Sequence, residues 1–199
     1  MKRFTLSLLV ASLLCLSGAS ASASAQPSER FELRDGDRVV FLGDVLMERE
    51  QTYGHIETEL TIRFPDDNVT FRNLGWSGDT PGGIARAGLS LLQAGKEPAD
   101  EGFKQLKKQL DLVKPTVVFL GYGMADSLDE NTTLAEFEKG MNTLMDAIKD
   151  RPGAAKTRFV VLSPIWHENL GAPWPDPTAH NAKLAKFTKS LEQLADKRD

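Results

Sequence analysis

Carboxylates, hydroxyls and histidines occur in four segments that are rich in glycine or proline. The segments are Gly43-Asp44-Val45, Gly75 to Gly83, Gly121 to Asp126, and Ser163 to His167. A serine hydroxyl can attack a carbonyl carbon when a neighbouring base, such as a histidine, takes its proton. A carboxylate can instead act as a nucleophile, bind a metal ion or order a loop. These residue types therefore permit hydrolytic chemistry, provided that the fold brings them together.

Each of the four segments follows a short apolar run, which is typical of a buried β-strand. These runs are 39–42, 69–73, 116–120 and 159–162. Amphipathic patterns between and after them predict helices over 48–64, over 100–113, from Thr133 onward and from Thr178 onward. Thr133 and Glu136 form a capping box for the third helix. Thr178 is expected to cap the last.

Strands and helices thus alternate along the chain. Short, continuously apolar strands between amphipathic helices indicate a parallel sheet that is covered on both faces. With right-handed crossovers, the simplest fold is a flavodoxin-like three-layer α/β/α sandwich with a mainly parallel sheet. Functional groups in such folds gather at the carboxyl ends of the strands. We therefore expect the four segments to lie along one edge of the sheet.

The composition is that of an ordinary globular protein. Lys and Arg number 24 against 28 Asp and Glu, which gives a net charge of -4. This balance predicts no nucleic-acid partner, because binding to phosphate backbones needs an excess of basic residues. The single cysteine, Cys15, excludes an intramolecular disulfide and a multi-cysteine metal site.

The first 25 residues have the layout of a secretory signal peptide. Lys2 and Arg3 are followed by the apolar run 4–16 and by Ala23-Ser24-Ala25, a cleavage-site pattern. A run this short does not span a bilayer, which takes about 20 apolar residues. Lipid attachment at Cys15 is an alternative, although Leu14 before it is large for that motif.

We therefore predict cleavage after Ala25 and a secreted or periplasmic protein. The product has 174 of the 199 residues and a net charge of -6, since only Lys2 and Arg3 are lost among the charged residues. No later segment is apolar enough to span a membrane, so we expect no stable membrane insertion after cleavage.

Three of the segments resemble, in the same order, the sequence blocks of the SGNH (GDSL) hydrolases. Gly43-Asp44-Val45-Leu46 resembles the GDSL block, 73–80 the second block, and Gly123-Met124-Ala125-Asp126 the G-x-N-D block. Residues 74–80 and 175–181 are further similar to a secreted GDSL-like group of planctomycete-type bacteria. The resemblance implies esterase activity on lipids or acylated carbohydrates without a metal or cofactor.

The resemblance also assigns roles to individual positions. It places Val45 at the nucleophile and Ala125 at the asparagine of the oxyanion hole, and neither side chain can do that chemistry. Asp44 belongs to the same block as the nucleophile, and Gly78 could still donate its backbone N–H. The family's final D-x-x-H block and fifth strand have no counterpart here. The resemblance thus predicts a domain over 26–199 that is incomplete at its C-terminal end and catalytically impaired.

Other residues of these segments have two interpretations each. Ser77 could be a nucleophile, but a loop serine that bonds to local backbone is the simpler reading. Asp44 could bind a metal or attack a carbonyl, but its carboxylate more simply orders the loop by accepting backbone N–H groups. Asp126 lies at the same edge of the predicted sheet, and Asp126, His167 and His180 could line a cleft there.

The histidines and tryptophans also have a functional and a structural interpretation each. His55 is expected at a surface or boundary. A metal site would need His167, His180 and a carboxylate, Glu168 or Asp176, but this spacing matches no standard zinc pattern, so we predict no metal. Trp76, Trp166 and Trp174 could hold a glycan or acyl chain, although the last two could equally cover an edge of the core.

Three functional hypotheses remain open. The first is an impaired SGNH-type esterase, and the second is a secreted, non-catalytic glycan- or acyl-binding module. The third is a truncated product of a longer gene. All three imply a small-molecule, carbohydrate or lipid ester as ligand or ancestral substrate. The sequence leaves the oligomeric state undetermined.

Overall fold

The computed structural model describes residues 31–88, 95 and 100–198. The chain divides into a unit Met1–Glu32 and a unit Leu33–Asp199, and the four strands of the sheet all belong to the second unit. The predicted signal peptide, with Cys15 and the cleavage site after Ala25, lies outside the described residues. Within the described part, no helix is both long and apolar enough to cross a membrane.

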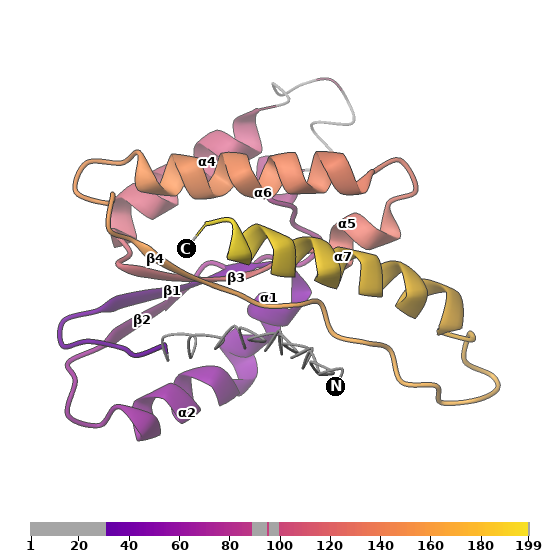
Figure 1. Cartoon of the computed structure of the whole chain (residues 1–199), viewed down its shortest axis with the longest axis horizontal. Coiled ribbons are helices and arrows are strands. Elements are labelled where there is room, and N and C mark those ends of the chain that lie inside the picture. Colours follow the sequence, from indigo (N-terminus) through magenta and orange to yellow (C-terminus); the bar gives the residue numbers. More distant parts are fainter. Residues whose placement is uncertain (1–30, 89–94, 96–99, 199) are drawn as a thin grey trace, which may run out of the picture. The chain divides into compact units, whose positions relative to one another are not determined.

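Four parallel strands form one sheet in the order β2-β1-β3-β4 (Figure 1). They are β1 (Arg38–Gly43), β2 (Thr70–Asn73), β3 (Val117–Gly121) and β4 (Arg158–Val161). The central strand β3 is buried along its whole length, and β1 is buried after its first residue. Strands covered on both faces read as unbroken apolar runs, which is why the sequence located β1 and β3.

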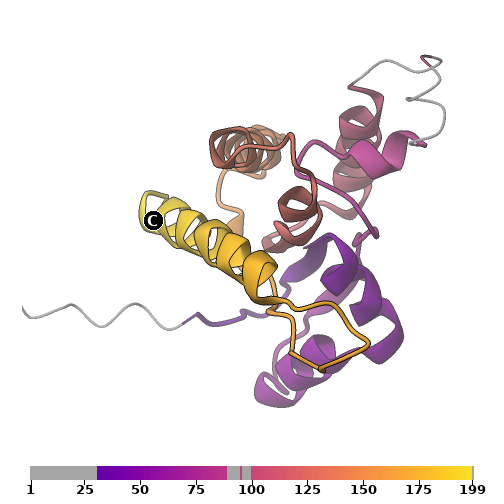
Figure 2. The same cartoon turned by 90° about the vertical axis from the view of Figure 1, so that its right-hand side faces the viewer.

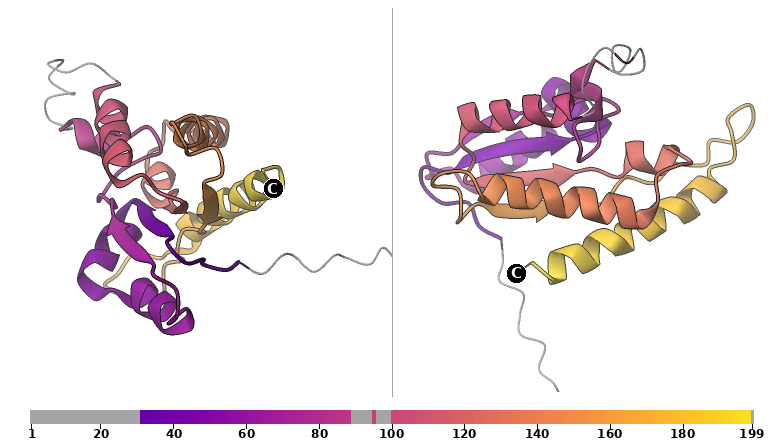
Figure 3. Two further views of the ribbon diagram at one scale, coloured as in Figure 1. Left: turned by 90° about the vertical axis from the view of Figure 1, so that its left-hand side faces the viewer. Right: turned by 90° about the horizontal axis from the view of Figure 1, so that it is seen from above.

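Helices cover both faces of the sheet. One face packs against α4 (Glu101–Val113), α6 (Leu134–Lys149) and α7 (Thr178–Asp196), and the other against α1 (Val45–Tyr53) and α2 (His55–Arg63). Figures 2 and 3 show α4 and α6 on the side of the sheet away from α1 and α2. The predicted three-layer α/β/α sandwich is confirmed.

The single helix predicted over 48–64 is wrong. The chain breaks at Gly54, whose φ of 61° is left-handed, so that α1 and α2 are separate helices. The carboxylate of Glu50 accepts the N–H groups of Ile56 (2.7 Å) and Glu57 (3.1 Å). It thereby satisfies donors that the start of a helix leaves free. The helical spacing of apolar residues continues from α1 into α2, so the break between the two helices could not be recognised from the sequence.

At the helix starts, one prediction is confirmed and one is wrong. Thr133 and Glu136 form the predicted capping box of α6. Thr178 is the first residue of α7 and does not cap it, because its Oγ1 donates to Asp176 Oδ1 (2.6 Å). Two short elements have no counterpart in the prediction, the 3-10 helix η1 (Ile84–Ala87) and α5 (Met124–Leu128). Both lie in glycine-containing loops.

The loops after β1, β2 and β3 meet at the carboxyl edge of the sheet. The Asp44 N–H donates to Gly121 O and the Trp76 N–H to Gly43 O, both at 3.0 Å. A Cβ atom on Gly43 would lie 2.3 Å from Gly121 O, so only glycine allows this approach. The expected convergence of these three loops is therefore correct.

Candidate active site

Asp44 ties the first loop to the third. Its side chain is buried, and its Oδ2 accepts the N–H groups of Met124 (3.0 Å) and Ala125 (3.2 Å) at the start of α5. Burial raises the pKa of Asp44, and these backbone hydrogen bonds oppose the rise. The carboxylate thus orders backbone, as its simpler interpretation expected, but the backbone belongs to another loop.

Val45 follows Asp44 directly in the chain, and Ala125 is one of the two residues whose N–H groups donate to the Asp44 carboxylate. Val45 is the first residue of α1, Ala125 lies in the first turn of α5, and both are half-buried. Neither side chain carries a donor or a removable proton. The positions that the sequence resemblance assigns to a nucleophile and an oxyanion donor therefore present only alkyl groups.

Ser77 and Gly78 lie exposed in the second loop, where Gly78 has a left-handed φ of 71°. Ser77 Oγ donates to Glu48 Oε2 (3.2 Å), a carboxylate of α1. The expectation that Ser77 bonds to local backbone is wrong. No sequence pattern linked it to Glu48, which lies 29 positions away.

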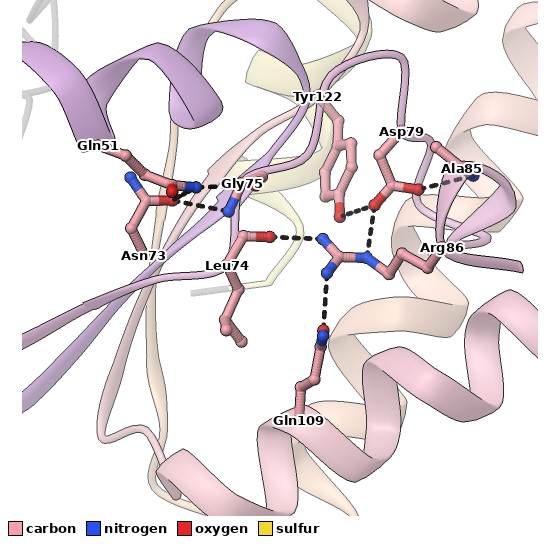
Figure 4. A network of polar contacts seen from close by, with 9 residues as sticks. All are labelled: Gln51, Asn73, Leu74, Gly75, Asp79, Ala85, Arg86, Gln109 and Tyr122. Atoms are coloured by element: carbon pink, nitrogen blue, oxygen red, sulfur yellow. Dashed lines mark hydrogen bonds and ion pairs between the residues drawn. The ribbon is translucent and has the colours of Figure 1, made fainter. Parts of the chain in front are cut away.

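A buried ion pair holds the second loop (Figure 4). Asp79 Oδ2 lies 2.8 Å from Arg86 Nε, and the two side chains are 0% and 2% exposed. Arg86 also donates to Gln109 Oε1 (2.7 Å) on α4 and to Leu74 O (2.5 Å). The hydroxyl of Tyr122, just after β3, lies 3.5 Å from Asp79 Oδ2. Burial raises the pKa of Asp79, and the Arg86 guanidinium opposes that rise.

The turn between β2 and this loop has its own polar contacts (Figure 4). Asn73 Oδ1 accepts the Gly75 N–H (2.7 Å), and Gln51 Nε2 donates to Gly75 O (3.1 Å). Asn73 Nδ2 donates to Met47 O (2.7 Å). The second loop is thus fixed from both ends, although Gly78 at its tip is exposed.

Asp126 is the most perturbed carboxyl of the site. It is 4% exposed, and its Oδ2 is buried without a hydrogen-bond partner in the described part of the chain. Burial raises the pKa of Asp126 to about 7, and the negative charges of Asp44 and Asp79 add to the rise. Below that pH, a neutral carboxylic acid lies buried in the first turn of α5.

The structure joins Ser127, His180 and His167 in a chain of hydrogen bonds. Ser127 Oγ lies 2.9 Å from His180 Nε2, and His180 Nδ1 lies 2.7 Å from His167 Nε2. Asn181 fixes His167 by bonding to both its N–H (2.9 Å) and its carbonyl (2.8 Å). The sequence predicted both histidines as possible cleft residues and considered them together as metal ligands, but it did not identify Ser127.

This chain does not have the geometry of a catalytic triad. Ser127 is 1% exposed, and its hydroxyl donates to Met124 O (2.7 Å). Its Oγ therefore accepts the proton of His180 Nε2, so His180 is not free to act as its base. The three residues instead link α5 to α7 and the loop before it.

Neither a metal site nor tryptophan cover of the core is found in the described residues. No group of three His, Cys, Asp or Glu side chains there could hold a metal ion. Asp176, considered as a ligand, instead bonds to Thr178. Trp166 and Trp174 are 61% and 64% exposed, so they do not cover an edge of the core. Trp76 is also exposed. The Arg86 guanidinium lies over its indole, with Arg86 Cζ 5.8 Å from the ring centroid of Trp76.

No family model and no curated protein sequence matches the chain. Solved structures do match. An α/β hydrolase enzyme from the metagenome of Lake Arreo, Spain, has a TM-score of 0.53 and 18% identity, over 83% of this chain and 75% of that one. A catalytic mutant of an acetylxylan esterase from Geobacillus stearothermophilus has a TM-score of 0.59 and 15% identity, over 84% and 75%.

A gut microbial diltiazem-metabolizing enzyme matches with a TM-score of 0.58 and 20% identity, over 83% of this chain and 36% of that one. Identities this low carry the fold and nothing finer. The chain shares its fold with these solved structures, which include an α/β hydrolase enzyme and an acetylxylan esterase.

Proposed function

We propose that the protein is an exported SGNH-type ester-hydrolase domain whose hydrolytic site is impaired. Its ligand is an ester of a lipid or of an acylated carbohydrate. The observation that carries the proposal is the Asp44 carboxylate, which ties the first loop to the third beside Val45 and Ala125, the residues that the resemblance assigns to the nucleophile and the oxyanion donor. The fold shared with esterases supports the same reading.

The expected rate follows from the missing groups. Enzymes that lose a triad member keep about 10³- to 10⁴-fold catalysis over water, from the oxyanion hole and binding. Losing one oxyanion donor costs about another 10²- to 10³-fold. With both Val45 and Ala125 in place, the remaining acceleration is between about one and about a hundred times the rate in water.

The test is hydrolysis of p-nitrophenyl acetate and of acetylated xylooligosaccharides. We expect the protein and its Val45→Ser variant to be close to the buffer rate, because both ring nitrogens of His180 are already bonded, to Ser127 and to His167. Ser77→Ala and Ser127→Ala serve as controls. Robust turnover that either control abolishes would show a working nucleophile elsewhere. Restoration of turnover by Val45→Ser alone would equally contradict the proposal.

A second function, non-catalytic binding of a glycan or acyl chain, is favoured by the exposed indoles. Trp76, Trp166 and Trp174 are 47%, 61% and 64% exposed, and aromatic faces of this kind bind sugar rings and acyl chains. Titration with acetylated xylooligosaccharides should then quench tryptophan fluorescence without hydrolysis. Trp174→Ala should weaken binding, while Tyr53→Ala, an equally exposed aromatic on α1, should not. Absence of binding to polysaccharides and acylated ligands would exclude this function.

Export is the remaining part of the proposal. It rests on the three-part layout of residues 1–25 in the sequence. Protein recovered from the periplasm or medium should begin at Gln26. A mature chain that begins at a lipid-modified Cys15 would contradict cleavage after Ala25.

A further inference from the structure

A cavity of about 620 Å³ lies at the amino edge of the sheet, at the opposite ends of the strands from Asp44. Its walls come from the starts of β1 and β4, the end of α4, the residues just before β3, and the turn between α6 and β4. The carboxyl-edge loops contribute none of its lining, so it is a separate site. Its volume is within the range of small-molecule sites, about 300–1,000 Å³.

Basic side chains dominate this cavity. Six of them line it, namely Arg34, Arg38, Lys114, Arg151, Lys156 and Arg158, against two carboxylates, Asp37 and Asp111. The whole chain has a net charge of -4. The positive charge is therefore gathered locally, against the overall balance of the protein.

The two carboxylates leave most of that charge uncompensated. Asp37 is nearly buried and forms an ion pair with Arg158, and it also accepts a hydrogen bond from Thr116 Oγ1 (2.7 Å). Asp111 is 63% exposed and lies 3.9 Å from Arg151 Nη1, beyond hydrogen-bond distance. Lys114 and Lys156 are exposed to solvent.

Arg151 is the buried member of the set. Its side chain is only 8% exposed, and its Nε donates to Ile148 O (3.2 Å) and its Nη1 to Leu110 O. Its Nη2 is buried with no hydrogen-bond partner among the residues that the structure describes. A buried guanidinium with a free donor is costly when its counter-ion is a solvent-exposed carboxylate 3.9 Å away, and a bound anion would supply the missing hydrogen bond and charge.

Lys114 is held in an unfavourable backbone conformation beside Arg38. Its φ is 48°, and it is the only non-glycine residue with a positive φ in the described ranges. Glycine is the usual residue at such a left-handed helix end. The Lys114 carbonyl accepts a hydrogen bond from Arg38 Nε (2.6 Å), which holds the Arg38 guanidinium beside the Lys114 backbone.

We propose that this cavity binds a small molecule with at least two phosphate or sulfate groups. Guanidinium groups present forked donors that match tetrahedral oxyanions, and lysines add charge without a fixed geometry. The excess of four positive charges in the lining calls for a ligand with more than one negative charge. The site is independent of the hydrolase-like cleft, and the proposal does not rest on the function of that cleft.

The test is calorimetric titration of the full chain with pyrophosphate at about 0.05 M NaCl, where screening is weak. A trisulfated disaccharide and citrate form parallel arms that distinguish phosphate, sulfate and carboxylate ligands. We expect saturable 1:1 binding of pyrophosphate or the sulfated sugar, stronger than binding of citrate, with affinity falling as salt is raised. Tighter binding of citrate than of both would overturn the assignment to phosphate or sulfate.

Two variants separate charge from folding. Lys156→Gln and Lys114→Gly should each raise the dissociation constant about fivefold, the effect of one unit charge about 4 Å away in water. Lys114→Gly should leave the melting temperature unchanged or higher, because glycine adopts the φ of 48° without strain. Lys186→Gln, an exposed lysine of α7 outside the cavity lining, should change neither quantity.

Three outcomes would overturn the proposal. They are no saturable binding up to about 10 mM, an affinity unaffected by both cavity variants, or an equal loss of affinity in Lys186→Gln.

Discussion

Replacing Asp79 by alanine removes the counter-ion of a guanidinium that is almost inaccessible to water. Arg86 is 2% exposed and lies 2.8 Å from Asp79, and it keeps its hydrogen bonds to Gln109 and Leu74 in the variant. Two further donors lose their acceptor, the Ala85 N–H (3.3 Å) and the Tyr122 hydroxyl (3.5 Å). The variant therefore leaves one buried charge, the buried Tyr122 hydroxyl and the half-buried Ala85 N–H without this acceptor.

The magnitude follows from these contacts. Breaking a buried ion pair by removing one partner costs about 3–5 kcal/mol. The retained bonds of Arg86 favour the lower end of that range, but each orphaned donor adds about 1 kcal/mol or more. We expect the free energy of unfolding to fall by about 4 kcal/mol. A typical domain has about 5–15 kcal/mol in total, so the loss should be plain.

Urea denaturation followed by circular dichroism at neutral pH measures this loss. Asp66→Ala is the matched control, because Asp66 is an exposed carboxylate, and it should change the free energy of unfolding by less than about 0.5 kcal/mol. The double variant Asp79→Leu/Arg86→Met should recover most of the loss, because it removes both charges. A loss below about 1 kcal/mol in Asp79→Ala would refute the reasoning from burial and charge.

Three further predictions concern substitutions of single residues. Asp126 has a pKa of about 7 in the fold and an ordinary value of 3.8. Between these values the unfolded chain has lost a proton that the fold keeps, so the free energy of unfolding should fall as pH rises, by up to about 1 kcal/mol per pH unit. Asp126→Asn should abolish this slope in urea titrations at several pH values, and parallel curves for both proteins would contradict it. Gly43→Ala should lower the free energy of unfolding by about 1–3 kcal/mol in thermal denaturation, because the new Cβ would lie 2.3 Å from the Gly121 carbonyl oxygen. Gly82→Ala is the control and should be tolerated, because the nearest atom to its Cβ would be 3.6 Å away. Glu50→Ala removes the carboxylate that caps α2 and should cost about 0.5–2 kcal/mol of unfolding free energy, so an unchanged urea midpoint would argue against the cap.

The strands could be predicted because their signal is local. Both β1 and β3 are covered on two faces, so each reads as an unbroken apolar run. The capping box of α6 is equally local, since Thr133 and Glu136 are three residues apart. The break at Gly54 was not predicted, because the apolar spacing is continuous and the capping carboxylate of Glu50 is recognised only in three dimensions.

The site divides in the same way. Parallel strands place their carboxyl ends at one edge, so the convergence of the first three loops followed from strand order alone. The partners within the loops did not. Asp44 bonds to backbone about 80 positions away, and Ser127 meets His180 across 53 positions. Such contacts depend on where each side chain points once the helices have packed.

By itself, the sequence determined the layered fold, the edge at which the first three loops gather, and the presence of alkyl side chains at Val45 and Ala125, the positions that the family resemblance assigns to reactive groups. These features follow from residue types and from patterns over short stretches of sequence, so they can be recognised without a structure. Only the tertiary structure decided that Ser127 is buried and donates to a carbonyl, and that Asp126 holds its proton near pH 7. Only the tertiary structure also shows that the basic side chains line one cavity. They come from segments that are distant in the chain and meet only when these segments pack together.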